Sequence, residues 1–175
     1  EKPIIVSELL NSPEARKKID AGLLAGDREV TKLVLRNLLE PNYQSGAIVD
    51  GYPRTKTQVE CLKLFHRRLT ELRHKYLGTF QEAQFPKPRF HIIMLFIDEE
   101  ESVRRQFIRG QRSLDHNAEV DASGVGKRRE VRKTDLDEAA AHSRYKTFKE
   151  STYDSLTTLR DVFHYHFINA HGSVI

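Results

Sequence analysis

The sequence has little of several features that mark secreted, metal-bound or membrane proteins. One of its 175 residues is cysteine, Cys61, which excludes an internal disulfide and a zinc site built from cysteines. No apolar run reaches the length of a membrane span, and the residues after Glu1 do not resemble a signal peptide. We therefore expect a cytoplasmic protein without a membrane partner, or one of an organelle stroma or matrix if a transit peptide has been removed.

The excess of positive charge is also small. Lysine and arginine number 29 against 25 aspartate and glutamate, a formal net charge of +4. The basic residues are spread over several segments without interleaved exposed aromatic residues, so we expect no nucleic-acid partner. A basic run in the helix expected over residues 59–76 is more typical of a solvated helix face. The charge is compatible with a pocket for a small polyanion.

The length and composition are those of one ordinary folded domain. Hydrophobic residues make up 38% and charged residues 31% of the chain, as in globular rather than disordered proteins. Residues 90–97 read FHIIMLFI, a continuous apolar run. This pattern is typical of a central parallel strand that is buried on both faces.

The most informative stretch is residues 47–58, which read AIVDGYPRTKTQ. Its first three residues indicate a buried strand and place Asp50 at the carboxyl end, where open α/β sheets bind ligands. Gly51 lets the backbone approach a ligand closely, and Pro53 fixes φ just before Arg54. The Arg54 guanidinium offers a planar set of donors that suits a phosphate. The alternative is a plain strand-to-helix turn that happens to carry an arginine.

Residues 48–58 closely resemble the signature of adenylate kinases and related nucleoside monophosphate kinases. That signature is a hydrophobic strand, Asp-Gly-Phe/Tyr-Pro-Arg, and a glutamine or asparagine four residues after the arginine. The resemblance implies an α/β fold of the P-loop kinase type, three-layer α/β/α with a parallel sheet. It also implies monophosphate-binding helices over residues 11–41 and a short lid over residues 110–131. We expect residues 1–175 to form a single domain of this type, incomplete at both ends.

The resemblance assigns roles to residues of the signature. Arg54 would grip the acceptor phosphate, and Gln58 would read the acceptor base. Asp50 would orient a water on Mg²⁺, an ion that keeps several waters when it binds to proteins. The remaining residues expected in this part of the nucleotide site are Gly51, Tyr52 and Pro53.

Residues 21–27 resemble the family's Gly-x-Leu-Val-x-Asp segment, whose backbone faces the adenine of the monophosphate. In this chain the corresponding residues are Leu23, Leu24 and Ala25. The alternative is a helix-to-helix turn that ends in Asp27 as an N-cap, and both interpretations can hold together.

Four further arginines carry the phosphate chemistry in this resemblance. Arg105 and Arg109 lie four residues apart and hence on one helix face, where two cations repel each other unless an anion lies between them. In the family, the first of such a pair contacts the ATP base and the second its phosphates. A plain basic helix face is the alternative. Arg132, at the lid exit, and Arg144, twelve residues later, match the arginines that close on the transferring group.

The lid expected after Arg109 is polar and contains glycine, which suits a mobile flap over residues 111–130. It lacks the four metal ligands that some family lids carry, and His116 alone is more typical of a surface histidine. We therefore expect no zinc, and Mg²⁺ with ATP as the cofactor. His164 and His166 share one face of the last expected strand, where a structural role is more typical than a catalytic one.

The resemblance predicts a phosphotransferase that moves the γ-phosphate of ATP to a nucleoside monophosphate, AMP in the first place. Its partners would be these small nucleotides, bound to a monomer. However, Val6 and Asn11 stand where the family has a threonine and an arginine that bind the monophosphate. Two alternatives therefore stay open: a kinase for a different monophosphate, and a nucleotide-binding regulatory module that has lost catalysis.

The phosphate-cradling loop Gly-x-x-x-x-Gly-Lys does not occur in these residues. In the family this loop precedes the monophosphate-binding segment, and Glu1 lies just upstream of the equivalent segment here. We therefore expect the 175 residues to be an excerpt of a longer protein, with a degenerate kinase as the alternative. Without the loop's backbone N–H groups and lysine, no site remains for the β- and γ-phosphates, so this segment alone is expected to be inactive.

Overall fold

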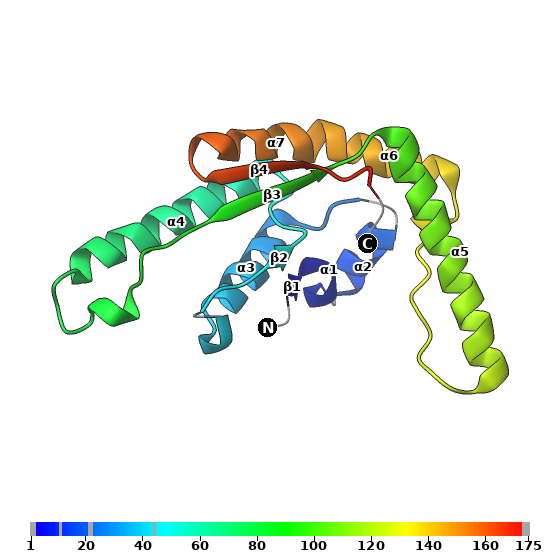
Figure 1. Ribbon diagram of the computed structural model, residues 1–175, viewed down its shortest axis with the longest axis horizontal. Helices are drawn as coiled ribbons and strands as arrows, with labels where there is room; N and C mark the ends of the chain where they lie inside the picture. Colours follow the sequence, from blue (N-terminus) through cyan, green and yellow to red (C-terminus); the bar gives the residue numbers. More distant parts are fainter. Residues whose placement is uncertain (1–2, 11, 21–22, 44, 173–175) are drawn as a thin grey trace.

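The computed structural model describes residues 3–10, 12–20, 23–43 and 45–172 (Figure 1). Its strands are β1 (Ile4–Ile5), β2 (Val49–Asp50), β3 (His91–Phe96) and β4 (His164–Asn169). Its α-helices are α1 (Val6–Leu9), α2 (Pro13–Asp20), α3 (Asp27–Leu38), α4 (Lys56–Tyr76), α5 (Glu99–Ser123), α6 (Glu138–Thr147) and α7 (Asp154–Thr157). Shorter turns are η1 (Pro41–Tyr43), η2 (Glu82–Gln84), η3 (Lys133–Asp135), the π-helical η4 (Phe148–Tyr153) and η5 (Thr158–Asp161). The α/β class predicted from the sequence is confirmed.

The strands form two parallel pairs. β1 pairs with β2 in the register Ile4 to Val49, and β3 pairs with β4 from His91 opposite His164 to Phe96 opposite Asn169. Parallel pairing brings the carboxyl ends of paired strands to the same edge. The segments that follow β2 and β3 therefore both leave the carboxyl ends of strands, the positions from which the sequence predicted a ligand site.

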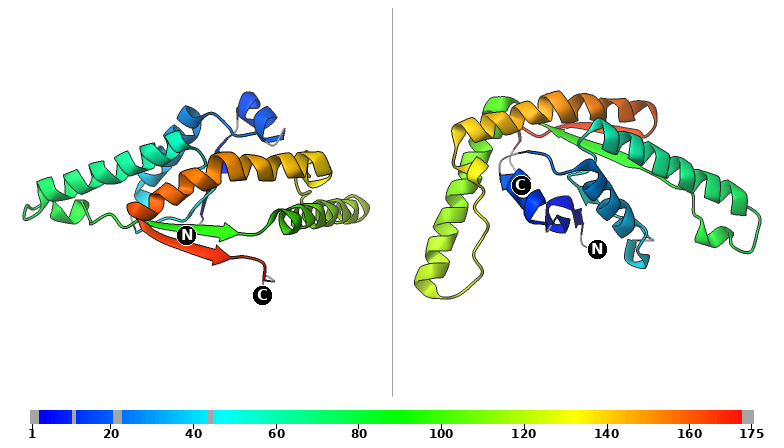
Figure 2. Two further views of the ribbon diagram at one scale, coloured as in Figure 1. Left: turned by 90° about the horizontal axis from the view of Figure 1, so that it is seen from above. Right: turned by 180° about the vertical axis from the view of Figure 1, so that it is seen from behind.

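One prediction about β3 is wrong. The strand is not buried on both faces: Met94 is 4% exposed, whereas Ile93 and Leu95 are each 63% exposed. The described part of the chain gives β3 one neighbouring strand, β4, and its helices α4 and α7 cover only one face of the pair (Figure 2). The apolar sequence predicted burial, but a second covering layer over this face is not among the described residues.

Two clusters of buried side chains support these strands. The first joins α1, α2 and α3 through Val6, Leu10, Ala15, Val30 and Val34. The second joins α4 to the segment before β4 through Val59, Leu62, Leu159 and Phe163. Tyr52 packs against both clusters. The turn that follows β2 is therefore anchored where the two cores meet.

Helix α4 begins with a side-chain N-cap. Thr55 has an extended backbone, and its side-chain oxygen accepts a hydrogen bond from the Gln58 N–H at 3.2 Å. This satisfies one of the N–H groups that a helix start leaves without a partner, so the helix can begin at Lys56. The signature turn thus passes directly into a helix of 21 residues.

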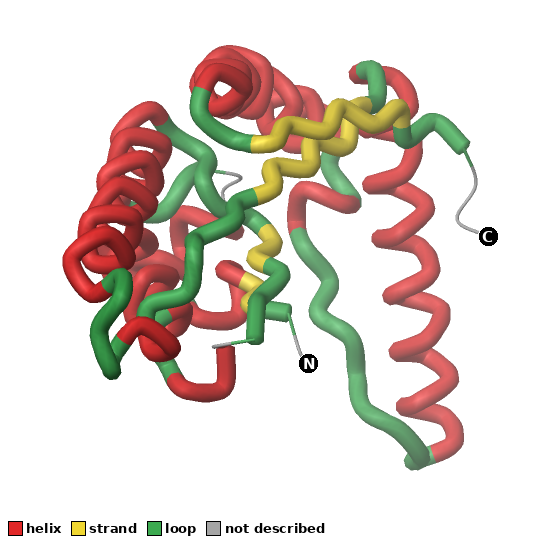
Figure 3. Tube along the Cα trace, turned by 60° about the vertical axis from the view of Figure 1, so that its left-hand side comes forward, coloured by secondary structure: helices red, strands yellow, loops and turns green. Residues whose placement is uncertain are grey.

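Helix α5 continues into residues 111–130, the segment that the sequence predicts as a flap. The helix has 25 residues and continues to Ser123, so much of the expected flap is regular helix. It begins at an N-cap, in which Asp98 Oδ1 accepts from the Glu101 N–H at 2.8 Å, and ends where Gly124 adopts φ 66°. The chain then runs back along the helix (Figure 3), and the Asn117 amide exchanges two hydrogen bonds with the Arg129 backbone. Among the described helices, none is long and apolar enough to cross a membrane.

Candidate functional site

The signature turn gives Arg54 a specific place after β2. Gly51 has φ +90°, a conformation that residues with a Cβ rarely adopt. A Cβ built on Gly51 would lie 2.8 Å from Arg54 Nη2, because the guanidinium folds back over the glycine. Gly51 is therefore needed for the backbone turn and for the position of the guanidinium.

The backbone of Arg54 is held on both sides. Its N–H donates to Gln58 Oε1 at 2.8 Å, and its carbonyl accepts from the Thr152 hydroxyl at 2.9 Å. Gln58 is 2% exposed and donates through Nε2 to Asp27 Oδ1 at 2.9 Å. The Thr55 hydroxyl donates to the same Asp27 oxygen at 2.7 Å. The turn is thus tied to α3 through Asp27 and to η4 through Thr152.

These contacts bear on two sequence predictions. Asp27 is not the N-cap of α3, because Gly26 occupies the cap position and the Asp27 carboxylate accepts from α4 instead. Gln58 uses both ends of its amide inside the protein in this arrangement. Its contact with an acceptor base stays a prediction, and its observed role is to hold Arg54.

Four of the predicted arginines come from four segments and lie close enough for their charges to act on one another. The pKa of Arg144 is lowered to about 10, first by burial and then by the charges of Arg109, Arg132 and Arg54, against the opposing charge of Asp135. Burial also lowers the pKa of Arg54, with the Asp50 charge raising it and the Arg132 charge lowering it. These residues come from the β2–α4 turn, α5, the segment before η3, and α6.

The charge of this arginine cluster (Arg54, Arg109, Arg132 and Arg144) is only partly compensated. Arg109 forms an ion pair with Asp135, which is 3% exposed: Arg109 Nε lies 2.7 Å from Oδ2, and Nη2 contacts Oδ1. This hydrogen bonding raises the pKa of Arg109. Within the described ranges, the other three arginines form no ion pair. Such a site favours a ligand that carries several negative charges.

Asp135 is a site residue whose role the sequence did not show. The Asp135 carboxylate does not cap the following helix, because Asp137 caps α6 by accepting from the Ala140 N–H at 3.0 Å. A Cβ built on Gly110 would lie 2.4 Å from the Asp135 carbonyl oxygen. Gly110 therefore lets α5 come close enough for its neighbour Arg109 to reach the Asp135 carboxylate.

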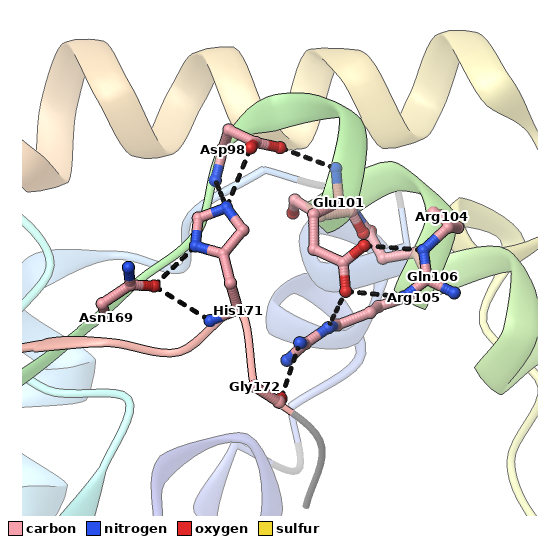
Figure 4. Close-up of polar contacts among 9 residues, drawn as sticks. Asp98, Glu101, Arg104, Arg105, Gln106, Asn169, His171 and Gly172 are labelled. Carbon is pink, nitrogen blue, oxygen red and sulfur yellow. Dashed lines mark hydrogen bonds and ion pairs between the residues drawn. The ribbon is translucent and has the colours of Figure 1, made fainter.

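Arg105 does not share an anion with Arg109. Its Nε lies 2.5 Å from Glu101 Oε1, and its Nη2 donates to the Gly172 carbonyl at 3.1 Å (Figure 4). Glu101 also binds Arg104, and the hydrogen bonds of Arg104 and then Arg105 lower the pKa of Glu101 to about 2. The two arginines of the predicted pair thus bind different carboxylates, Glu101 and Asp135. Arg105 lies beside the end of β4, and its contact with an ATP base stays a prediction.

The predicted acceptor side is less fully described. Leu23 is exposed and Leu24 and Ala25 are half-buried in the segment before α3, where their contact with adenine stays a prediction. Asn11 lies outside the described residues. Val6 is buried in the first core cluster, so it offers only packing where the family has a hydroxyl.

The metal prediction concerns one carboxylate. Asp50 is exposed at the end of β2, near enough to Arg54 to act on its pKa. One carboxylate fits Mg²⁺, which is commonly held by one or two carboxylates together with waters and substrate phosphates. Within the described ranges, no group of three or more histidine, cysteine, aspartate or glutamate residues could hold a metal ion.

Comparison with known proteins adds an independent observation. No protein-family model matches the chain. The adenylate kinase of Lactobacillus helveticus is 34% identical over 92 residues, which cover 53% of this chain and 35% of that protein. The chain is thus similar to adenylate kinases over about half of its length. The adenylate kinase of Trichodesmium erythraeum is also 34% identical over 92 residues, 42% of its length, and that of Treponema pallidum is 40% identical over 50 residues, 24% of its length.

This relationship supports the P-loop kinase fold and a nucleotide kinase class for the chain. The matched region spans about a third of the length of the Lactobacillus relatives.

Proposed function

We propose that the protein transfers the γ-phosphoryl group of ATP to a nucleoside monophosphate, with AMP as the first candidate acceptor. The observation that carries this proposal is the convergence of Arg54, Arg109, Arg132 and Arg144, of which only Arg109 is ion-paired in the described structure. Phosphoryl transfer passes through a transition state whose negative charge is spread over several oxygens, so it requires positioned cations more than an acid and a base.

Each residue has a role in this proposal. Arg54, held at the end of β2, binds the acceptor phosphate. Arg132 and Arg144 contact the transferring group, and Arg109 binds the donor phosphates from α5. Asp50 would hold Mg²⁺, and the ion would supply charge neutralisation at the donor phosphates.

The acceptor need not be AMP. Val6 is buried among apolar side chains, so the acceptor site lacks one hydroxyl of the family pattern. This observation favours a second candidate function, a kinase for another nucleoside monophosphate.

A coupled assay of ADP formation tests both candidates. The full-length gene product is incubated with ATP, Mg²⁺ and, in turn, AMP, UMP, CMP or GMP, beside the 175-residue segment. We expect turnover by the full-length protein with one preferred acceptor. Arg54→Ala should lower turnover by at least about a hundredfold, the scale of losing one transition-state donor.

Arg68→Ala is the matched control, because Arg68 lies exposed on α4 and pairs with Glu71. It should leave turnover unchanged. Nucleotide binding without turnover of any acceptor would instead support a regulatory module, and near-normal turnover by Arg54→Ala would contradict the site.

A further inference from the structure

The Thr152 side chain makes a hydrogen bond that differs from those of the hydroxyl groups around it. Nearby hydroxyls donate to carbonyls of their own helical segment, namely Thr147 to Ser143, Ser155 to Ser151, Thr157 to Asp154 and Thr158 to Ser155. Thr152 is 6% exposed, and its hydroxyl instead donates at 2.9 Å to the carbonyl of Arg54, 98 residues away in the sequence. This bond connects the two segments that carry Arg54 and Arg144.

The position of Thr152 on its helix makes this connection direct. Thr152 lies in the π-helical turn η4, which follows α6 without a break, and Arg144 lies eight residues earlier on α6. π-Helical turns are rare and are frequent at functional sites. With the Arg54 N–H bound to Gln58, the Thr152 hydroxyl occupies the remaining backbone polar group of Arg54.

The charges explain why such a connection is needed. Arg54 and Arg132 both lower the pKa of Arg144, so the cluster repels itself when no anion is bound. A carboxylate could hold an arginine against this repulsion, as Asp135 holds Arg109, but it would neutralise the charge. A neutral hydroxyl on the Arg54 carbonyl holds the backbone and leaves the guanidinium for a phosphate.

We propose that Thr152 is a positioning residue for Arg54. Its hydroxyl sets the distance between the arginine of the acceptor phosphate and Arg144, which acts on the transferring group. This inference rests on the proposed function, because the distance matters for phosphoryl transfer between two bound substrates. Thr152 itself contacts no substrate.

The test compares Thr152→Val, which keeps the side-chain shape but removes the hydroxyl, with Thr152→Ser, which keeps the hydroxyl. Thr147→Val is the matched control, since it removes a hydroxyl that bonds only within α6. All variants are made in the full-length protein and assayed well below their unfolding temperatures. Steady-state kinetics give kcat and the KM of both substrates. A separate experiment gives the hydrogen exchange rate of the Arg54 backbone amide.

We expect Thr152→Val to lower kcat by about tenfold, because small displacements of a positioned group have large effects on rate. KM for ATP should stay within about twofold, since Arg105 and Arg109 keep their own partners. Exchange of the Arg54 amide should become at least about tenfold faster, as expected when the turn opens more readily by about 1.4 kcal/mol. Thr152→Ser should restore both values, and Thr147→Val should change neither.

Two results overturn the proposal. An unchanged exchange rate of the Arg54 amide in Thr152→Val would show that the hydroxyl does not hold the turn. Faster exchange with an unchanged kcat would show that the bond is structural only. If the unaltered protein turns over no acceptor, the proposed function fails, and an unchanged exchange rate then separately refutes the connection between Thr152 and Arg54.

Discussion

The chain has two groups of arginines, one at the start of α5 and the other the arginine cluster that α5 joins through Arg109, and their charges are compensated differently. At the base, Arg104 and Arg105 share the carboxylate of Glu101. In the arginine cluster, one carboxylate pairs with Arg109, and the described residues give Arg54, Arg132 and Arg144 no ion pair. The first group stabilises a helix start, whereas the second places repelling charges around a common region.

This difference indicates how to separate structural from functional arginines in one chain. A paired arginine at a helix start has its counter-charge built in and gains little from an added anion. Around an unpaired arginine whose pKa is lowered by its neighbours, a bound anion relieves the repulsion between the positive charges, so binding is favourable. The same residue type thus serves two purposes, and the partner decides which.

The largest expected effect is that of Arg144→Met in the arginine cluster. Turnover should fall by at least about a hundredfold, because a transition-state cation is lost. The free energy of unfolding should rise by about 1 kcal/mol, since burial and neighbouring arginines disfavour the charged Arg144. Coupled assays and urea unfolding measure the two quantities. The control Arg104→Met, at the base of α5, should change neither the turnover nor the free energy of unfolding in this way. A lower free energy of unfolding in Arg144→Met would contradict the proposed repulsion within the cluster.

The second expected effect is stabilisation by a polyanion. Inorganic tripolyphosphate at a hundred times its Kd should raise the free energy of unfolding by about 2.7 kcal/mol, the amount that mass action gives at this ratio. At the same tripolyphosphate concentration the gain should be smaller in Arg54→Ala and unchanged in Arg104→Met, because Arg54 belongs to the arginine cluster and Arg104 does not. Thermal unfolding at increasing ligand concentration measures it. Equal gains in both variants would place the anion elsewhere.

The third expected effect is a loss of stability when the carboxylate partner of Arg109 is removed. Asp135→Asn should lower the free energy of unfolding by about 2 kcal/mol, because a buried, charge-assisted hydrogen-bond partner is lost. Urea unfolding measures this change. The control is Asp121→Asn, whose ion pair with Arg128 is exposed and should contribute little. Similar losses in both variants would show that the burial of Asp135 has no special effect.

The smallest expected effect is a pH dependence at the base of α5. The pKa of Glu101 is lowered to about 2 from an ordinary 4.5, so the folded state favours its charged form. Its contribution to stability is therefore present above pH 4.5 and is lost as the pH falls towards 2. Urea unfolding of the unaltered protein and Glu101→Gln should show a difference at pH 6 that shrinks by pH 3. A difference independent of pH would contradict this assignment.

The sequence predicts the α/β class and the strand that leads into the signature turn, and the structure has both. Between Asp50 and Gln58 the sequence places a glycine where the backbone turns, and in the structure Gly51 has φ +90°. The family resemblance places Arg54, Arg132 and Arg144 at one site, and in the structure their charges act on one another, whereas their roles stay predictions. Local turn chemistry and motif spacing are readable because they depend on neighbouring residues.

The missed features all depend on contacts between distant segments. Thr152 lies 98 residues from Arg54, and Asp135 lies 26 residues from Arg109, so no local pattern reveals either contact. The exposed face of β3 was missed for a related reason: an apolar run shows that a strand suits burial, but not which layer covers it. The length of α5 was missed because its polar second half was taken for a flap.

Because α5 is long, a small change of its direction at Gly110 moves its far end by several ångströms. From Gly110 to Ser123 the helix extends for about 20 Å at 1.5 Å per residue. A rotation of about 10° at the glycine therefore moves the far end by about 3.5 Å, more than the width of a water molecule. A Cβ at this pivot would meet the Asp135 carbonyl oxygen at 2.4 Å. A single methyl group at this position would therefore tilt α5 away from Asp135, and the displacement would be largest at the Ser123 end of the helix.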